Sequence, residues 1–154
     1  MKRVSQFREA WLVNHRVNAL LLDAVGEEGL EQSYAPRARN VRKVFVHMHN
    51  QRLNWLGATL KNPPKIARLK AREAHDVATL KAALEESGQA MADLVERIFR
   101  KEEVKGFDRS PATFLAFVLA HEAHHRGQVV LTLRMAGKPI PRDAANALWD
   151  WDTL

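Results

Sequence analysis

Three histidines lie within one five-residue segment, 121–125 (HEAHH). Residues four positions apart on a helix differ by about 40° in direction and by about one turn in height, so His121 and His125 can both reach one metal ion. Burying two imidazoles costs free energy unless each is hydrogen-bonded or coordinated. The pair indicates a metal site or a hydrogen-bonded polar layer in the core, and Gln128 on the same face favours the metal site. His124, on another face, is expected to point toward a neighbouring helix or the surface.

The same segment also matches H-E-x-x-H, the pattern of zinc metallopeptidases. A metallopeptidase needs a third metal ligand, usually a histidine or glutamate further along the chain. After His125 the sequence contains neither, and its acidic residues there are Asp143, Asp150 and Asp152. No strand is predicted that could align a peptide substrate. We therefore do not favour a peptidase, and we expect the third ligand upstream.

His47 and His49 are the upstream candidates, on a predicted helix. Two positions along a helix correspond to a separation of about 160°, so only one of them can face inward with the pair. His47 lies on a face that mixes apolar and polar residues, whereas His49 lies among apolar ones. We prefer His47, and the pattern alone leaves His49 open. His15 and His75 are less favoured candidates for the third ligand, and we expect both at the surface.

The spacing of apolar residues is helical throughout, without a convincing alternating strand. Capping residues, glycines and prolines set the ends, including a Ser-Pro helix start at position 110 and an Asn-Pro-Pro stop at position 62. A short helical piece is expected within Ile66–Ala71. The four long helices are predicted at Val4–Val25, Asn40–Lys61, Asp76–Arg100 and Ser110–Ala136.

Four amphipathic helices predict an all-α four-helix bundle, which we expect to form a single domain over residues 1–154. We expect the short C-terminal tail, with Trp149 and Trp151, to pack on the bundle. The absence of cysteine excludes disulfides, thiolate zinc sites and cysteine nucleophiles. No apolar run is long enough for a membrane span and the N-terminus does not read as a signal peptide, so a cytoplasmic protein is expected.

The net charge of +6 and the pI of about 10 raise the possibility of nucleic-acid binding. The basic residues are spread along the chain, and no aromatic residues interleave with their clusters to stack bases. A solvated basic face is the preferred interpretation.

Two regions resemble the signature regions of the DinB-like (YfiT-like) family of metal-dependent enzymes. The first is 44–52 (VFVHMHNQR) with Trp55 beyond it, and the second is 121–128 (HEAHHRGQ), an H-x-x-x-H-x-G-Q motif. The resemblance covers essentially the whole chain and implies a metal triad of His47, His121 and His125. Family members studied as enzymes include thiol S-transferases and a maleylpyruvate isomerase, and members are often homodimers. The resemblance thus implies a small-molecule substrate, for which a low-molecular-weight thiol is one candidate, and a homodimer.

Three neutral imidazoles leave coordination positions open, as in a catalytic zinc site. Zinc fits this ligand set best, and nickel, cobalt or iron would also be accepted. Such an ion lowers the pKa of bound water or of a thiol and so makes a nucleophile at neutral pH. Gln128 and Glu122 are candidates to orient the imidazoles or a substrate, although we favour Glu122 as an exposed helix residue. The competing hypotheses are a non-catalytic metal- or ligand-binding bundle and, less favoured, a basic protein associated with nucleic acid.

Overall fold

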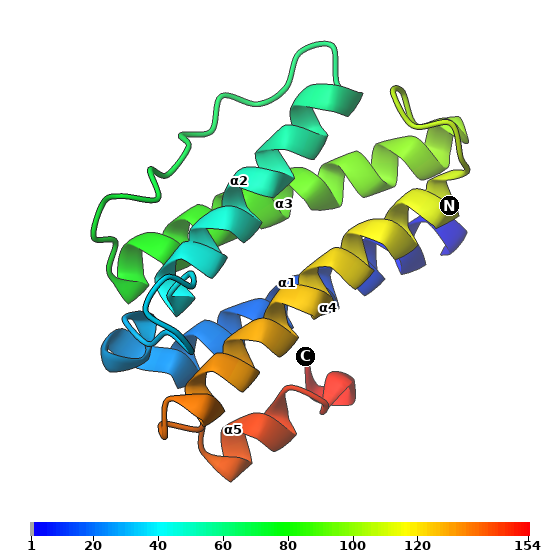
Figure 1. Cartoon of the computed structure of the whole chain (residues 1–154). Helices are drawn as coiled ribbons and strands as arrows, with labels where there is room; N and C mark the ends of the chain where they lie inside the picture. The colour runs from blue at the N-terminus through cyan, green and yellow to red at the C-terminus, as the bar shows by residue number, and fades with distance from the viewer. Residues whose placement is uncertain (1) are drawn as a thin grey trace.

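A computed structural model describes residues 2–154, and this part of the chain is helical without any strand. The four long helices and the order of their connections are shown in Figure 1. The prediction of an all-α four-helix bundle is therefore confirmed. The helices are α1 at Lys2–Leu30, α2 at Val41–Thr59, α3 at Val77–Lys101 and α4 at Pro111–Met135, followed by the short α5 at Arg142–Ala147 and a 3-10 turn at Trp151–Thr153.

Three of the long helices begin at residues whose side chains cap them. Asn40, Asp76 and Ser110 each accept a hydrogen bond from the backbone N–H three residues later. This contact satisfies one of the N–H groups that the first turn of a helix leaves without a partner. Pro111 occupies the first position of α4, where its missing N–H has no cost. The predicted starts of these three helices are correct to within one residue.

The first helix extends beyond its predicted end. We expected it to stop at Gly26, but α1 continues to Leu30 after an interruption at that glycine, whose φ of 59° and ψ of 179° are not helical. Glycine accepts a positive φ without a steric penalty. The chain kinks there and resumes a helical turn, which ends at Leu30, a residue that is completely buried in the core.

The connection between α2 and α3, residues 60–76, runs back along the outside of α2, so these two helices point in the same direction (Figure 1). The predicted short helix at Ile66–Ala71 is wrong, because this stretch is not helical. Instead, side chains of α2 form hydrogen bonds with the backbone groups of this stretch. Asn50 Nδ2 donates to Leu69 O at 2.7 Å, and Leu69 N donates to Asn50 Oδ1 at 3.1 Å.

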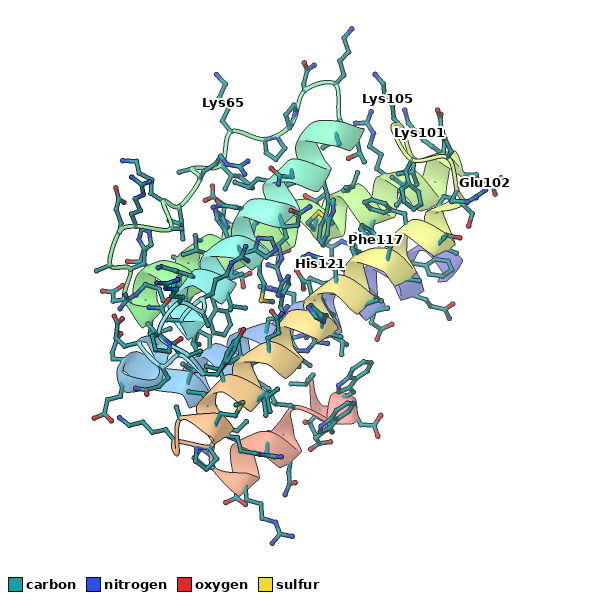
Figure 2. The ribbon with its side chains drawn as sticks, in the orientation of Figure 1. Lys65, Lys101, Glu102, Lys105, Phe117 and His121 are labelled. Atoms are coloured by element: carbon teal, nitrogen blue, oxygen red, sulfur yellow. The ribbon has the colours of Figure 1, made fainter. Side chains whose placement is uncertain are left out.

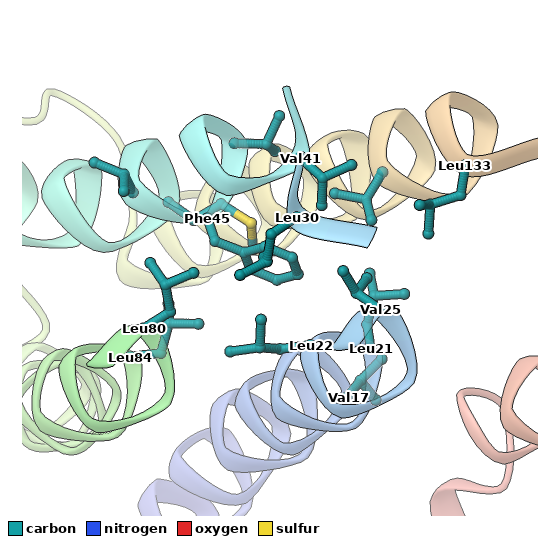
Figure 3. Packing of buried hydrophobic residues seen from close by; sticks show 14 of the residues in the cluster. Val17, Leu21, Leu22, Val25, Leu30, Val41, Phe45, Leu80, Leu84 and Leu133 are labelled. Atoms are coloured by element: carbon teal, nitrogen blue, oxygen red, sulfur yellow. The ribbon is translucent and has the colours of Figure 1, made fainter. Parts of the chain in front are cut away.

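The core consists of two hydrophobic clusters at opposite ends of the bundle with a polar layer between them. The first cluster joins the C-terminal parts of α1 and α4 to the N-terminal parts of α2 and α3 (Figure 3). The second joins the other ends and includes Trp11, Trp55 and Phe114. The buried polar residues at intermediate positions along the four helices are Asn14, His15, Asn18, His49, Arg52, Ser87, Glu122 and His125.

The C-terminal tail packs on the bundle through Leu148, which is buried and belongs to the first cluster. Trp149 and Trp151 are 81% and 49% exposed, so they carry little of this packing. Among residues 2–154, no helix has the length and apolar character that crossing a membrane requires.

Candidate metal centre

The structure gathers three histidines between α2 and α4. One ligand nitrogen each from His47, His121 and His125 lies within 4.8 Å of the other two. The ring centroid of His47 is 5.5 Å from that of His121 and 4.6 Å from that of His125. His125 is buried and the other two are half-buried. Figure 2 shows His121 on the side of α4 that faces α2.

His49 lies outside this cluster and has its own partners on the other side of α2. Its Nε2 is 2.9 Å from Ala67 O, and its Nδ1 is 3.1 Å from Ser87 Oγ. The ring therefore donates to the carbonyl and accepts from the hydroxyl. His49 joins α2 to α3 and to the connection before α3, and neither nitrogen is left to serve as a ligand.

A glutamine fixes the orientation of His125. The Nδ1 of His125 is 2.7 Å from Gln128 Oε1, so the ring donates its Nδ1–H to the amide oxygen. The Nε2 of His125 then carries its lone pair on the side of the other two histidines. The amide nitrogen of Gln128 donates in turn to His124 Nε2 at 3.0 Å. A metal-binding histidine typically has its second nitrogen held in this way.

His121 has the one buried side-chain nitrogen that lacks a partner among the described residues, Nδ1. Leaving a buried polar group unsatisfied costs about 1–3 kcal/mol. Its other nitrogen, Nε2, is 3.2 Å from Nε2 of His125. Ligands at about 2.0–2.1 Å from a tetrahedral zinc ion are separated by about 3.3 Å. The all-histidine donor set and the spacing of this Nε2 pair fit a site that a metal ion would complete.

The three imidazoles are neutral at pH 7, the form that binds a metal ion. Burial lowers the pKa of His125 to about 4, although the hydrogen bond that His125 donates to Gln128 raises it. Burial likewise lowers the pKa of His121. For His47, burial is the largest cause of a lowered pKa, and the positive charge of Arg39 is the next.

His15 and His75 are buried, so the expectation that they lie at the surface is wrong. Nε2 of His15 is 2.8 Å from Glu85 Oε2, and its ring fills the space beside Gly88, which has no side chain to occupy it. Nε2 of His75 is 3.0 Å from Lys70 O. Each ring is hydrogen-bonded within the fold and neither approaches the cluster. His124 is exposed, in line with the sequence analysis.

Glu122 is completely buried, so our preference for an exposed residue is also wrong. Its carboxylate faces away from the cluster and pairs with Arg52 of α2, whose Nε donates to Glu122 Oε1 at 2.6 Å. Burial raises the pKa of Glu122, but the charge and hydrogen bonds of Arg52 together with the hydrogen bonds from Asn14 and Asn18 keep this pKa below its ordinary value. Glu122 is thus unavailable as the general base that the H-E-x-x-H pattern of metallopeptidases requires.

Hydrogen bonds link this ion pair to two asparagines of α1 and, through them, to Arg126 of α4. Asn14 and Asn18 each donate from Nδ2 to Glu122 Oε2 at 2.6 Å, and Arg126 Nη1 donates to the Oδ1 atoms of both. Arg52 Nη1 also donates to Leu84 O of α3 at 2.8 Å. One feature of the sequence indicates this network. The two asparagines lie on the apolar stripe of α1, where buried polar side chains need hydrogen-bond partners.

Aromatic side chains enclose the cluster on the side of His121. The rings of Trp55 and His121 meet edge to face with centroids 5.1 Å apart, and Phe117 lies 5.9 Å from Trp55. Trp55 is buried, whereas Phe117 is 47% exposed. Figure 2 shows Phe117 one turn before His121 on α4. These rings cover one side of the histidine cluster.

Two surface depressions reach the cluster from other directions. One of about 540 Å³ is lined by His125 and Gln128 together with Tyr34, Leu131 and residues of the α1–α2 connection. The other, of about 300 Å³, is lined by His47 and by residues of α2 and the connection after it. Arg39 lines both. A small molecule can approach the histidines by these routes.

Comparisons with known proteins agree with this architecture. A family model described as the DinB family matches residues 1–152. A crystal structure of a DinB-like protein from Bacillus cereus ATCC 10987 is similar to the chain with a TM-score of 0.63 and 21% sequence identity, over 88% of this chain and 93% of that one. At this identity the likeness shows the fold alone. No curated protein matches the sequence.

Proposed function

Because this chain belongs to the DinB family, we propose that His47, His121 and His125 bind a divalent metal ion and that the protein is a metal-dependent enzyme acting on a small molecule. The observation that carries the proposal is the convergence of three imidazoles, from two helices, with ligand nitrogens within 4.8 Å of one another. Zinc suits an all-histidine ligand set best, and nickel, cobalt or iron are alternatives.

A divalent ion held by neutral imidazoles acts as a Lewis acid that lowers the pKa of a water or thiol. The chain itself contributes orientation and shielding. Gln128 holds His125 with its Nε2 lone pair toward the other ligands. Trp55 closes the side of His121, while the two depressions leave access from the sides of His47 and His125.

We propose a low-molecular-weight thiol as one substrate. The family resemblance supports this choice, since members studied as enzymes include thiol S-transferases. A thiol is also a group that an open metal site activates at neutral pH.

Metal content tests the ligand assignment. Purified wild-type protein is expected to contain about one equivalent of metal by emission spectrometry, and His121→Ala should lose it. His124→Ala is the matched control, because this histidine belongs to the same motif but is exposed and lies outside the cluster. Stoichiometric metal retained by His121→Ala would exclude the proposed triad.

Turnover separates an enzyme from a bundle that only binds metal. Thiol cofactors would be screened with electrophilic acceptors, with and without a chelator. Thiol transfer that the chelator abolishes and added metal restores is the expected result. A metal-loaded protein that turns over none of the pairs would favour the non-catalytic alternative.

We also propose a homodimer, as the family resemblance implies. The exposed indoles of Trp149 and Trp151 are available for such a contact. Analytical ultracentrifugation should give twice the chain mass for the wild type and a larger monomer fraction for Trp149→Ala. A monomeric wild type at micromolar concentration would contradict the proposal.

A further inference from the structure

The two depressions beside the histidine cluster share one residue, Arg39, which lies in the connection between α1 and α2. This arginine is exposed and makes no hydrogen bond or ion pair with any described residue. Its charge is nevertheless close enough to His47 to affect that ring. Arg39 therefore presents an unpaired guanidinium at the entrance to the cluster from both sides.

The charges around the site have one sign. The smaller depression also contains Lys43 and Arg68, and no aspartate or glutamate is among the described residues that line either depression. Arg68 donates to Asn54 Oδ1 at 2.9 Å, which leaves Arg39 and Lys43 as the cations without a partner. Three neutral imidazoles would leave the charge of a divalent ion uncompensated as well. A ligand that brings negative charge is favoured over a neutral one at such a site.

We propose that Arg39 recognises the carboxylate of an anionic substrate whose reacting atom lies at the histidine cluster. This inference rests on the proposed function and specifies its substrate class as small carboxylic acids. The planar fork of a guanidinium matches a carboxylate with two parallel hydrogen bonds. A single unpaired arginine supplies the donors for one such group. The depressions, at about 300 and 540 Å³, accommodate a small molecule beside it.

Cobalt-substituted protein allows binding to be measured without turnover. The protein would be loaded with Co²⁺ and titrated at low ionic strength with 3-mercaptopropionate or 3-mercaptopropan-1-ol, following the visible absorption of the ion. The two probes share the thiol and the chain length and differ in the carboxylate. The wild type is expected to bind the acid about tenfold more tightly than the alcohol, as a partly exposed charge-assisted contact allows. High salt should reduce this preference, because the contact is solvent-exposed.

Variants of Arg39 test whether this residue causes the preference for the acid over the alcohol. Arg39→Gln should bind cobalt as the wild type does but discriminate less than about threefold between the probes. Arg39→Lys, which keeps the charge, should retain an intermediate preference. Arg37→Gln is the matched control, since it removes the same charge two positions away at a residue that lines neither depression. It should leave the preference of the wild type unchanged.

The outcomes distinguish this inference from the function on which it rests. If the wild type binds no stoichiometric cobalt, the metal site itself is wrong. If cobalt binds but neither probe changes its absorption, the thiol proposal and the carboxylate assignment both fail. If both probes bind equally, the carboxylate assignment alone is overturned. A preference that persists in Arg39→Gln at the wild-type level excludes Arg39 as the recognising residue.

Discussion

Glu122 and Arg52 form an ion pair in which both side chains are completely buried, and Glu122 directly follows His121 in α4. Neighbouring residues on a helix point about 100° apart, so this pair fixes the rotation of α4 about its axis. With Glu122 directed at Arg52, His121 and His125 face His47 on the same neighbouring helix. The ion pair is thus a positioning device for the histidine cluster.

Removing one member of this pair should be costly, because it leaves a buried charge uncompensated. Glu122→Leu and Arg52→Met are each expected to lower the free energy of unfolding by about 3–5 kcal/mol, measured by denaturant titration. The double variant should lose less than the sum of the two, since neither charge then remains. Additive losses would show that the pair is not coupled.

Gln128 should control metal affinity through His125. Gln128→Ala removes the acceptor that holds the ring and is expected to weaken zinc binding by about 10- to 100-fold in competition with a chelating dye. Gln89→Ala is the matched control, because Gln89 is also an exposed helical glutamine but donates to Glu85, remote from the cluster. Unchanged affinity in Gln128→Ala would mean that His125 is held by packing alone.

Two glycines should respond to alanine in opposite ways. A Cβ at Gly88 would lie 2.6 Å from Nδ1 of the buried His15 ring, so Gly88→Ala is expected to destabilise the fold by about 1–3 kcal/mol. Gly127 lies on α4, and a Cβ there would meet nothing within 4 Å. Gly127→Ala should therefore stabilise the fold by about 0.5–1 kcal/mol. Thermal and urea unfolding would measure both changes. A neutral Gly88→Ala would show that His15 can move aside.

The metal-free protein should become less stable as the pH falls from 7.5 to 5. Several histidines have a pKa below the ordinary 6.5 in the fold, so near and below pH 6.5 the unfolded chain binds protons that the folded chain does not. Stability is therefore complete above pH 6.5 and decreases toward the folded pKa values, of which that of His125 is about 4. Urea midpoints at a series of pH values would measure the decrease. A midpoint that rises on acidification would contradict it. The histidines concerned are His15, His47, His49, His121 and His125.

Local features of the sequence were sufficient to predict the four long helices, apart from the last turn of α1. The capping side chains of Asn40, Asp76 and Ser110 mark helix starts whatever lies nearby, because a cap satisfies backbone groups within its own turn. The spacing of His121 and His125 likewise places both on one face of α4 by helix geometry alone. These predictions need no knowledge of neighbouring helices.

The tertiary structure decided how each helix is turned toward its neighbours. Helical spacing separates His47 from His49 by direction but does not reveal which of the two faces α4. That choice depends on pairings between helices, such as His49 with Ser87 and Glu122 with Arg52. The pairing with Arg52 also buries Glu122, which the sequence alone suggested would be exposed. A periodic pattern gives relative directions within one helix, whereas only side-chain partners on other helices set its rotation in the bundle.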